Sequence, residues 1–172
     1  MHKSIIGLTS LFALWILGGC VTAIETTSPV EIRAANSTER AHWQRTDFHV
    51  GGLDTWIAPE PTVVRNDIVH ARRSVDDFGH PTVILQFDQA ASRKMDELTT
   101  RRASRPLAII LDGRVVAAPL VTTPISETLV VNFGKDPEGS TTADKLVNAI
   151  GHHAESGGSN RVTAESTDVG SD

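Results

Sequence analysis

The chain has 172 residues and a formal net charge of −5 at pH 7, and 40% of its residues are hydrophobic. This length suits one domain with a core, whereas the acidic balance and the lack of a dense run of lysine and arginine argue against a nucleic-acid partner. Cys20 is the only cysteine, which excludes an intramolecular disulfide.

The first 19 residues have the layout of a signal peptide. A short, positively charged start ends at Lys3, residues 5–17 are mainly apolar, and the small residues Gly18 and Gly19 precede Cys20. The apolar run is shorter than the roughly 20 residues that cross a bilayer core. We therefore predict that residues 1–19 are a cleaved signal peptide.

The residues at the predicted cleavage site indicate a lipid anchor. Leu17-Gly18-Gly19-Cys20 resembles the bacterial lipobox, in which the cysteine thiol takes a diacylglycerol and becomes the mature N-terminus. The resemblance implies that Cys20 is lipidated and that its acyl chains hold the protein to a membrane. An uncleaved signal anchor with a buried cysteine is the alternative.

The expected location follows from the anchor. Val21, in place of aspartate, resembles the pattern of outer-membrane lipoproteins in many Gram-negative bacteria. We expect the protein in the cell envelope, either on the outer side of the cytoplasmic membrane or in the outer membrane facing the periplasm.

The rest of the chain divides into three parts. Residues 20–45 carry the lipidated cysteine and show little apolar periodicity, so we predict a flexible tether. Residues 46–151 contain most of the apolar side chains and form the predicted domain. Residues 152–172 include Ser156-Gly157-Gly158-Ser159 and are predicted to be a disordered tail.

The first half of the domain contains three predicted elements. Residues 50–58 indicate a strand or hairpin that stops at Pro59-Glu60-Pro61. Asn66 or Asp67 is a candidate cap for a short helix through Ile68 and Ala71. Residues 81–87 alternate apolar and polar positions, as in a strand with one buried face.

The second half begins with a helix capped by Asp88, in which Ala91, Met95 and Leu98 form an apolar stripe. Residues 107–111 are nearly all apolar, which predicts a central strand covered on both faces. Asp112 and Gly113 follow, and Asp-Gly between apolar runs predicts a structural turn of type I′ into a strand over residues 115–118.

Two further elements complete the domain. Residues 129–131 predict a last strand, and Thr141 or Thr142 is expected to start a helix that ends at Gly151. Helices that interrupt neighbouring strands of a small sheet indicate an α+β fold. We expect a small mixed or antiparallel sheet with helices packed mainly on one face.

Several short motifs between about Trp56 and Ile150 resemble one known family. They are Pro59-Glu60-Pro61, Asp67-Ile68, Phe87-Asp88-Gln89-Ala90-Ala91, Leu98-Thr99, Leu107 to Gly113, Val116, Ala118-Pro119 and Pro124-Ile125. Together they resemble the head subdomain of the large periplasmic domain of SecD, a membrane subunit of the SecDF complex that assists the Sec translocon. The resemblance implies the SecD head fold and a habit of binding extended polypeptide.

The sequence also departs from this family. Ser104-Arg105-Pro106 stands where the family usually has a glycine and a basic residue, and Ser126-Glu127-Thr128 replaces a glycine-rich turn. The chain lacks the array of membrane helices and the base subdomain of SecD. The resemblance therefore does not imply that this chain acts as an export motor.

The residue pattern indicates neither an enzyme nor a cofactor protein. No Gly-x-Ser-x-Gly elbow places a nucleophile, and no histidine pair has the His-x-x-x-His spacing of two metal ligands on one helix face. We expect no catalytic residue, no cofactor and no metal. His152 and His153 are expected to be solvated, while Arg101, Arg102 and Arg105 are a candidate basic patch.

Two function classes remain open. In the first, the protein is a non-catalytic module that binds exported polypeptide or the Sec machinery, and an edge strand near residues 115–119 or 129–131 accepts an extended peptide. In the second, it is a small-ligand-binding, immunity or envelope-stress lipoprotein that shares only the fold. That class requires an apolar cavity lined by Leu85, Met95, Leu98 and Ile109. We favour the first class.

Overall fold

The computed structural model describes residues 24–135 and 137–151. The predicted signal peptide, Cys20 and the predicted tail over residues 152–172 lie outside these ranges. The described residues form β1 (Val30–Asn36), β2 (Gln44–Val50), β3 (Leu53–Ile57), β4 (Val63–Val64), η1 (Arg65–Asp67), β5 (Ile68–Val75), β6 (Pro81–Phe87), α1 (Gln89–Thr100), β7 (Leu107–Leu111), β8 (Arg114–Ala117), β9 (Thr128–Asn132) and α2 (Pro137–Gly151).

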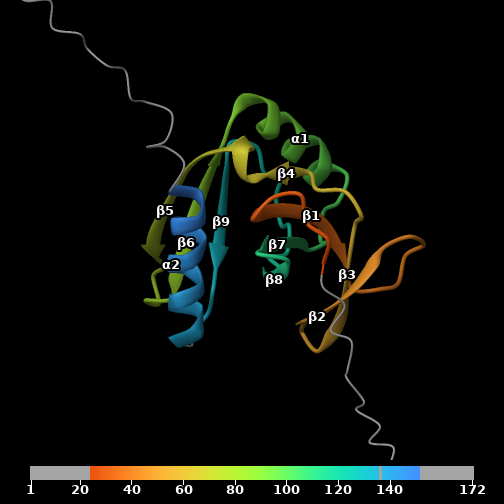
Figure 1. Ribbon diagram of the computed structural model, residues 1–172, viewed down its shortest axis with the longest axis horizontal. Helices are drawn as coiled ribbons and strands as arrows, with labels where there is room; N and C mark the ends of the chain where they lie inside the picture. Colours follow the sequence, from red (N-terminus) through yellow and green to blue (C-terminus); the bar gives the residue numbers. More distant parts are fainter. Residues whose placement is uncertain (1–23, 136, 152–172) are drawn as a thin grey trace, which may run out of the picture.

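The strands form two antiparallel sheets (Figure 1). The larger has the order β2-β3-β1-β7-β8, with β4 also paired to β1, and the smaller has the order β5-β6-β9. Leu85 of β6, Met95 of α1 and Leu146 of α2 belong to one buried cluster, so both helices contribute to the same core. The α+β prediction is confirmed, with two antiparallel sheets where one small sheet was expected.

Strand β1 corrects the prediction of a flexible tether. Residues 30–36 lie within the predicted tether, yet all of them are buried. β1 pairs with β7 along one edge, from Val30 opposite Leu111 to Ala34 opposite Leu107, and with β4 and β3 along the other. Val30, Ile32 and Ala34 alternate with Glu31 and Arg33, a strand-like pattern that the tether prediction overlooked. The two charged residues are buried as well, which the alternation alone does not indicate.

The short helix predicted after Asp67 is wrong. Asp67 Oδ2 accepts a hydrogen bond from Val64 N at 3.0 Å, but this closes only the single turn η1. The next residues form β5, which pairs with β6 along its length. Ile68 and Val69 are β-branched and favour a strand, and pairing with β6 outweighs the capping signal.

Strands β6 and β7 and helix α1 form where the local patterns predicted them. Asp88 caps α1, because its Oδ1 accepts a hydrogen bond from Ala91 N at 2.7 Å. All five residues of β7 are buried. Leu107, Ile109 and Leu111 face the main core, while Ala108 and Ile110 belong to a second cluster with Ile57 of β3.

Helix α2 begins at Pro137, earlier than the predicted Thr141 or Thr142, and Gly151 is its last residue. Leu146 and Ile150 are buried and Val147 is partly buried against the core. Within the described ranges, no helix has the length and apolar character needed to cross a membrane.

Candidate peptide-binding groove

Strand β9 lies at one edge of the smaller sheet, because among the described residues β6 is its only neighbour in that sheet. Phe87 N donates to Glu127 O at 2.9 Å, and Phe133 N donates to Pro81 O at 3.0 Å. Antiparallel strands alternate hydrogen-bonded and non-bonded pairs. In this register, the backbone N–H and C=O groups of Thr128, Val130 and Asn132 therefore point away from β6.

The side chains of β9 also alternate. Leu129 and Val131 are buried in the core, whereas Thr128, Val130 and Asn132 are exposed. Val130 keeps 55% of its surface in contact with solvent. β9 therefore presents an exposed apolar side chain next to backbone groups that no other described strand pairs with. Such an edge is able to pair with a further strand.

The segment that connects β8 to β9 first runs beside residues 104–107, where β7 begins. Leu107 N donates to Pro119 O at 3.0 Å, Val121 N donates to Arg105 O at 3.0 Å, and Ser104 N donates to Val121 O at 2.8 Å. These bonds hold residues 119–121 as an extended arm beside the larger sheet.

Thr99 of α1 fixes the turn between this arm and β9. Thr99 is buried, with 1% of the residue exposed. Its hydroxyl donates a hydrogen bond to Met95 O at 2.7 Å and accepts one from Ile125 N at 2.8 Å. Because the hydroxyl both donates and accepts a hydrogen bond, its burial leaves no polar atom of the Thr99 side chain without a partner. The chain turns at Pro124 and returns as β9.

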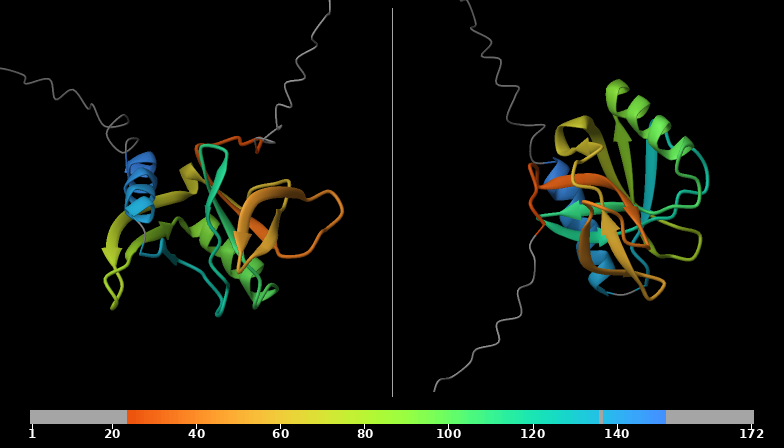
Figure 2. Two further views of the ribbon diagram at one scale, coloured as in Figure 1. Left: turned by 90° about the horizontal axis from the view of Figure 1, so that it is seen from below. Right: turned by 90° about the vertical axis from the view of Figure 1, so that its right-hand side faces the viewer.

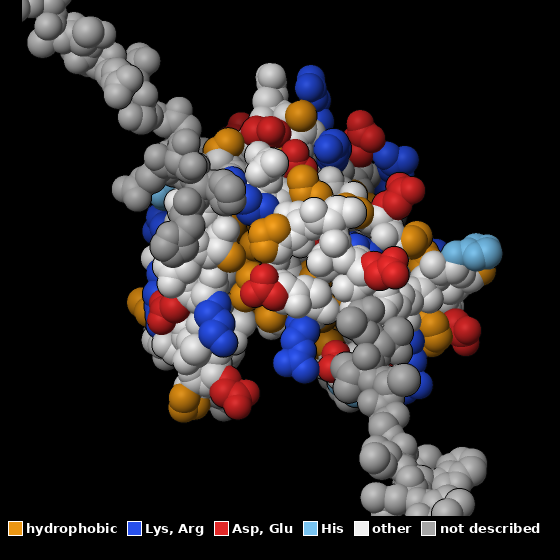
Figure 3. Space-filling view, in the orientation of Figure 1, with side chains coloured by type: hydrophobic (Ala, Val, Ile, Leu, Met, Phe, Trp, Pro, Cys, Tyr) orange, Lys and Arg blue, Asp and Glu red, His pale blue; other side chains and the backbone are white. Residues whose placement is uncertain are grey.

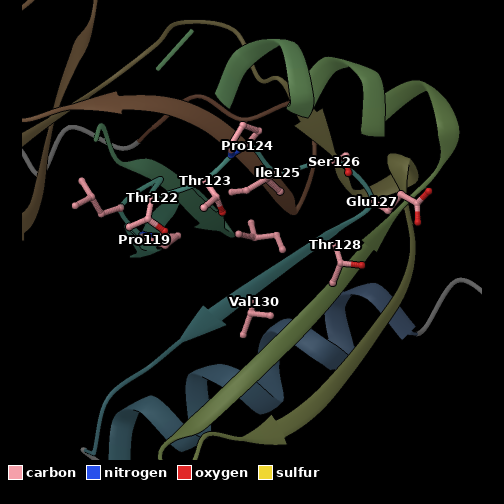
Figure 4. Close-up of a pocket in the computed structure, with 11 residues that line it drawn as sticks. Pro119, Thr122, Thr123, Pro124, Ile125, Ser126, Glu127, Thr128 and Val130 are labelled. Carbon is pink, nitrogen blue, oxygen red and sulfur yellow. The ribbon is translucent and has the colours of Figure 1, made fainter. Parts of the chain in front are cut away.

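The arm, the turn and β9 enclose a groove of about 480 Å³, here called the β9 groove (Figure 4). It is lined by Pro119, Leu120, Thr122, Thr123, Pro124, Ile125, Ser126, Glu127, Thr128, Leu129 and Val130. Leu120 and Val130 are both 55% exposed. The lining offers hydroxyls, apolar side chains and the carboxylate of Glu127, a set suited to hydrogen bonding and van der Waals contact.

One end of β9 is joined to the β5–β6 turn through Asp76. Its carboxylate accepts hydrogen bonds from Phe78 N at 2.9 Å, His80 N at 2.8 Å and Asn132 Nδ2 at 2.7 Å. Burial would raise the pKa of Asp76, but the hydrogen bonds from His80, Phe78 and Asn132, together with the charge of His80, hold this pKa below its ordinary value. Sequence reasoning missed Asp76 because Asn132 is distant in the chain.

Asp112 and Gly113 lie away from the β9 groove, at the turn between β7 and β8. Their φ angles are 48° and 76°, the positive values that an Asp-Gly turn of this kind requires. A Cβ on Gly113 would lie 3.2 Å from the carbonyl oxygen of Ile24. The turn is therefore packed against the first described residues.

The residues expected to line a ligand cavity form core instead. Leu85, Met95 and Ile109 are fully buried and belong to one continuous cluster, and Leu98 packs against that cluster. Within the described part of the chain, no group of three or more histidine, cysteine, aspartate or glutamate residues is arranged to hold a metal ion.

Comparison with known proteins gives one consistent result. Residues 45–164 match the family model described as SecDF, P1 head subdomain. The protein translocase subunit SecD of Acidaminococcus fermentans is 42% identical over 60 residues, which is 35% of this chain and 14% of the relative. SecDF of Thermus thermophilus is 39% identical over 69 residues, which is 38% of this chain and 9% of the relative.

Solved structures give the same fold. A structure of SecDF, described as a membrane component that enhances protein export, aligns with a TM-score of 0.50 at 23% identity over 70% of this chain and 61% of that chain. A crystal structure of SecDF in the super-membrane-facing form aligns with the same TM-score and identity over 18% of that chain. The chain spans only 14% of the length of the Acidaminococcus fermentans SecD and 9% of that of the Thermus thermophilus SecDF.

Proposed function

The chain belongs to the SecDF P1 head subdomain family, and we propose from this that it is a non-catalytic protein-export module that binds extended polypeptide outside the cytoplasm. The observation that carries the proposal is the unpaired edge of β9 beside the β9 groove. The polypeptide is an exported chain before it folds, and the Sec machinery is the partner that delivers it.

Binding occurs by addition of a strand to the smaller sheet. The incoming backbone pairs with the free N–H and C=O groups of Thr128, Val130 and Asn132, and its side chains contact Val130 and Leu120. Each hydrogen bond contributes about 0.5–1.5 kcal/mol. A short ladder of such bonds gives weak, sequence-tolerant binding, which suits a chain that must be released.

We propose further that the protein is a lipoprotein anchored through Cys20. The chain is held to the domain from Ile24 onward: Ile24 is buried, and the next carbonyl, that of Glu25, accepts a hydrogen bond from Arg33 at 2.7 Å. Four Cα–Cα steps separate Cys20 from Ile24, a span of at most about 15 Å. The anchor therefore holds the face around Ile24 close to the bilayer.

This anchor directs the β9 groove away from the membrane. The left panel of Figure 2 shows the first described residues and the β7–β8 turn on one side of the molecule, with the loop between β8 and β9 on the opposite side. A polypeptide in the periplasm thus reaches the groove without crossing the face next to the bilayer. The protein lies on the outer side of the cytoplasmic membrane or in the outer membrane facing the periplasm.

The proposal is tested by recovery of partners from intact membranes. Full-length protein is crosslinked mildly in its own cells, purified by affinity and identified with its partners by mass spectrometry. We expect Sec components and a range of exported proteins, which should disappear from a Cys20→Ala sample that loses the anchor. A preparation with one unrelated envelope protein, or with none of these partners, would contradict the proposal.

A further inference from the structure

Trp43 is in contact with two arginines that come from distant parts of the chain. The guanidinium carbon of Arg40 is 5.4 Å from the centre of the indole ring, and that of Arg102 is 5.3 Å from it. A guanidinium group placed over an aromatic face is attracted to the negative charge of the ring's π system. The indole therefore brings two positive charges from distant parts of the chain close together.

A third arginine joins them from the segment before β7. Arg105 Nη1 donates to Asn36 Oδ1 at 2.6 Å, and Arg102 Nη2 donates to the carbonyl oxygen of the preceding residue, Ala35. Both arginines thus reach the end of β1. Arg40, Trp43, Arg102 and Arg105 are here called the arginine–tryptophan cluster.

The positive charges of this cluster are not neutralised within the described residues. Ion pairs within 4.0 Å are found for neighbours such as Arg101 with Glu97, but none involves Arg40, Arg102 or Arg105. Burial lowers the pKa of Arg102, and the charges of Arg40 and Arg105 lower it further. The Nε of Arg102 is buried, and no described residue forms a hydrogen bond with it. An anion placed among these groups would relieve their repulsion.

The cluster lies beside one end of the β9 groove. Ala35 N donates to Pro106 O at 3.1 Å, and Pro106 pairs on its other side with Leu120, which lines the groove. Neighbouring strands lie about 4.8 Å apart, so the end of β1 and Leu120 are separated by about 10 Å. An extended chain covers that distance with roughly three residues.

We propose that the arginine–tryptophan cluster binds the carboxylates of acidic residues in a polypeptide that occupies the β9 groove. This inference rests on the proposed function and adds a preference to it: the bound segment carries aspartate or glutamate a few residues beyond the part that pairs with β9. Guanidinium groups suit this role because their planar N–H donors match the two oxygens of a carboxylate.

Two fluorescein-labelled peptides test the inference on the full-length protein in detergent. Both contain five Thr-Val repeats, followed in one by Asp-Glu-Asp and in the other by Asn-Gln-Asn. We expect the acidic peptide to bind about tenfold more tightly by fluorescence anisotropy, since charge-assisted bonds add roughly 1.4 kcal/mol or more. A higher salt concentration should remove the difference in affinity between the two peptides while leaving the neutral peptide bound.

Arginine substitutions test whether the preference for the acidic peptide comes from the arginine–tryptophan cluster. Arg40→Gln combined with Arg105→Gln should reduce the preference to less than twofold, whereas Arg72→Gln on the exposed strand β5 removes an equivalent charge elsewhere and should leave it intact. Arg102 is left unchanged because it bonds to a backbone carbonyl of β1, that of Ala35, whereas Arg105 bonds to a side chain. Circular dichroism checks that each variant is folded. Equal binding of both peptides overturns the inference and leaves the proposed function standing. Binding of neither peptide overturns both.

Discussion

Glu31 and Arg33 form a buried ion pair on β1, with Arg33 Nη2 2.6 Å from Glu31 Oε2. The carboxylate also accepts a hydrogen bond from Ser28 N at 3.0 Å, and the guanidinium donates to Pro59 O at 2.8 Å. The pair thus joins the segment before β1 to the segment after β3. It explains how a strand with two charges is buried at the centre of the larger sheet (Figure 1).

Replacing Glu31 with glutamine should lower the free energy of unfolding by about 3–5 kcal/mol, because Arg33 would be left as an uncompensated buried charge. Urea denaturation followed by circular dichroism measures this change. Arg101→Ala, which breaks the exposed pair with Glu97, is the control and should cost about 1 kcal/mol or less. If both variants lost the same unfolding free energy, burial of the Glu31–Arg33 pair would not explain the cost of breaking it.

Val130→Pro should abolish binding of extended peptide and leave the protein folded, because it removes an N–H from the free edge of β9. Val131→Pro is the matched control: its N–H faces β6, so this variant should lose the folded state itself. Anisotropy with a labelled, permanently unfolded protein measures the binding, and thermal unfolding measures the stability. Retained binding in a folded Val130→Pro variant would rule out strand addition at this edge.

Gly139→Ala should lower the free energy of unfolding by roughly 1–3 kcal/mol, because the new Cβ would collide with the carbonyl of Phe133 just before α2. At the other end of the same helix, the new Cβ of Gly151→Ala would have no atom of the described residues within 4 Å. This variant should be neutral or slightly stabilising. Differential scanning calorimetry compares the two. A lower Tm for Gly151→Ala than for Gly139→Ala would contradict the steric explanation.

Asp76 should make stability depend on pH in acid. Its pKa in the folded state is lower than in the unfolded chain, so its contribution is complete above the unfolded value near pH 4 and is lost as pH falls through the folded value. Asp76→Asn should therefore be less stable than the native protein at pH 7. The two unfolding free energies should converge as the pH falls through the folded-state pKa of Asp76. A gap that stays constant throughout this fall would exclude ionisation of Asp76 as the cause.

Cys20→Ser should prevent labelling by radioactive palmitate and release the protein from the membrane fraction, because the only thiol that can be lipidated is removed. Val21→Asp keeps the thiol and serves as the control, which should be labelled normally. Labelling is measured on immunoprecipitated protein. Membrane association of Cys20→Ser equal to that of the native protein would instead favour an uncleaved signal anchor.

The space-filling surface shows why composition alone does not locate the proposed binding sites. In the view of Figure 3, basic, acidic and apolar side chains are mixed over the visible face, with a hollow at its lower edge. The formal charge of −5 describes the whole chain. It conceals the arginine–tryptophan cluster, whose members are brought together from residues 40–43 and 102–105.

Elements with a local cause were predictable. β6 follows from alternation of apolar residues, α1 from its Asp88 cap and apolar stripe, and β7 from its continuous apolar run. β5 was not predictable in this way, because a capping residue at Asp67 competes with the β-branched residues that follow it, and only pairing with β6 decides between them.

The sequence by itself determined the α+β class, the family and the positions of β6, α1 and β7, because capping, periodicity and helix or strand preference act between residues a few positions apart. Only the tertiary structure decided that β1 is central and that β9 is an edge. Arg33 meets Pro59, and Thr99 meets Ile125. Contacts of this kind depend on the path of the backbone through both sheets, which local preferences do not specify.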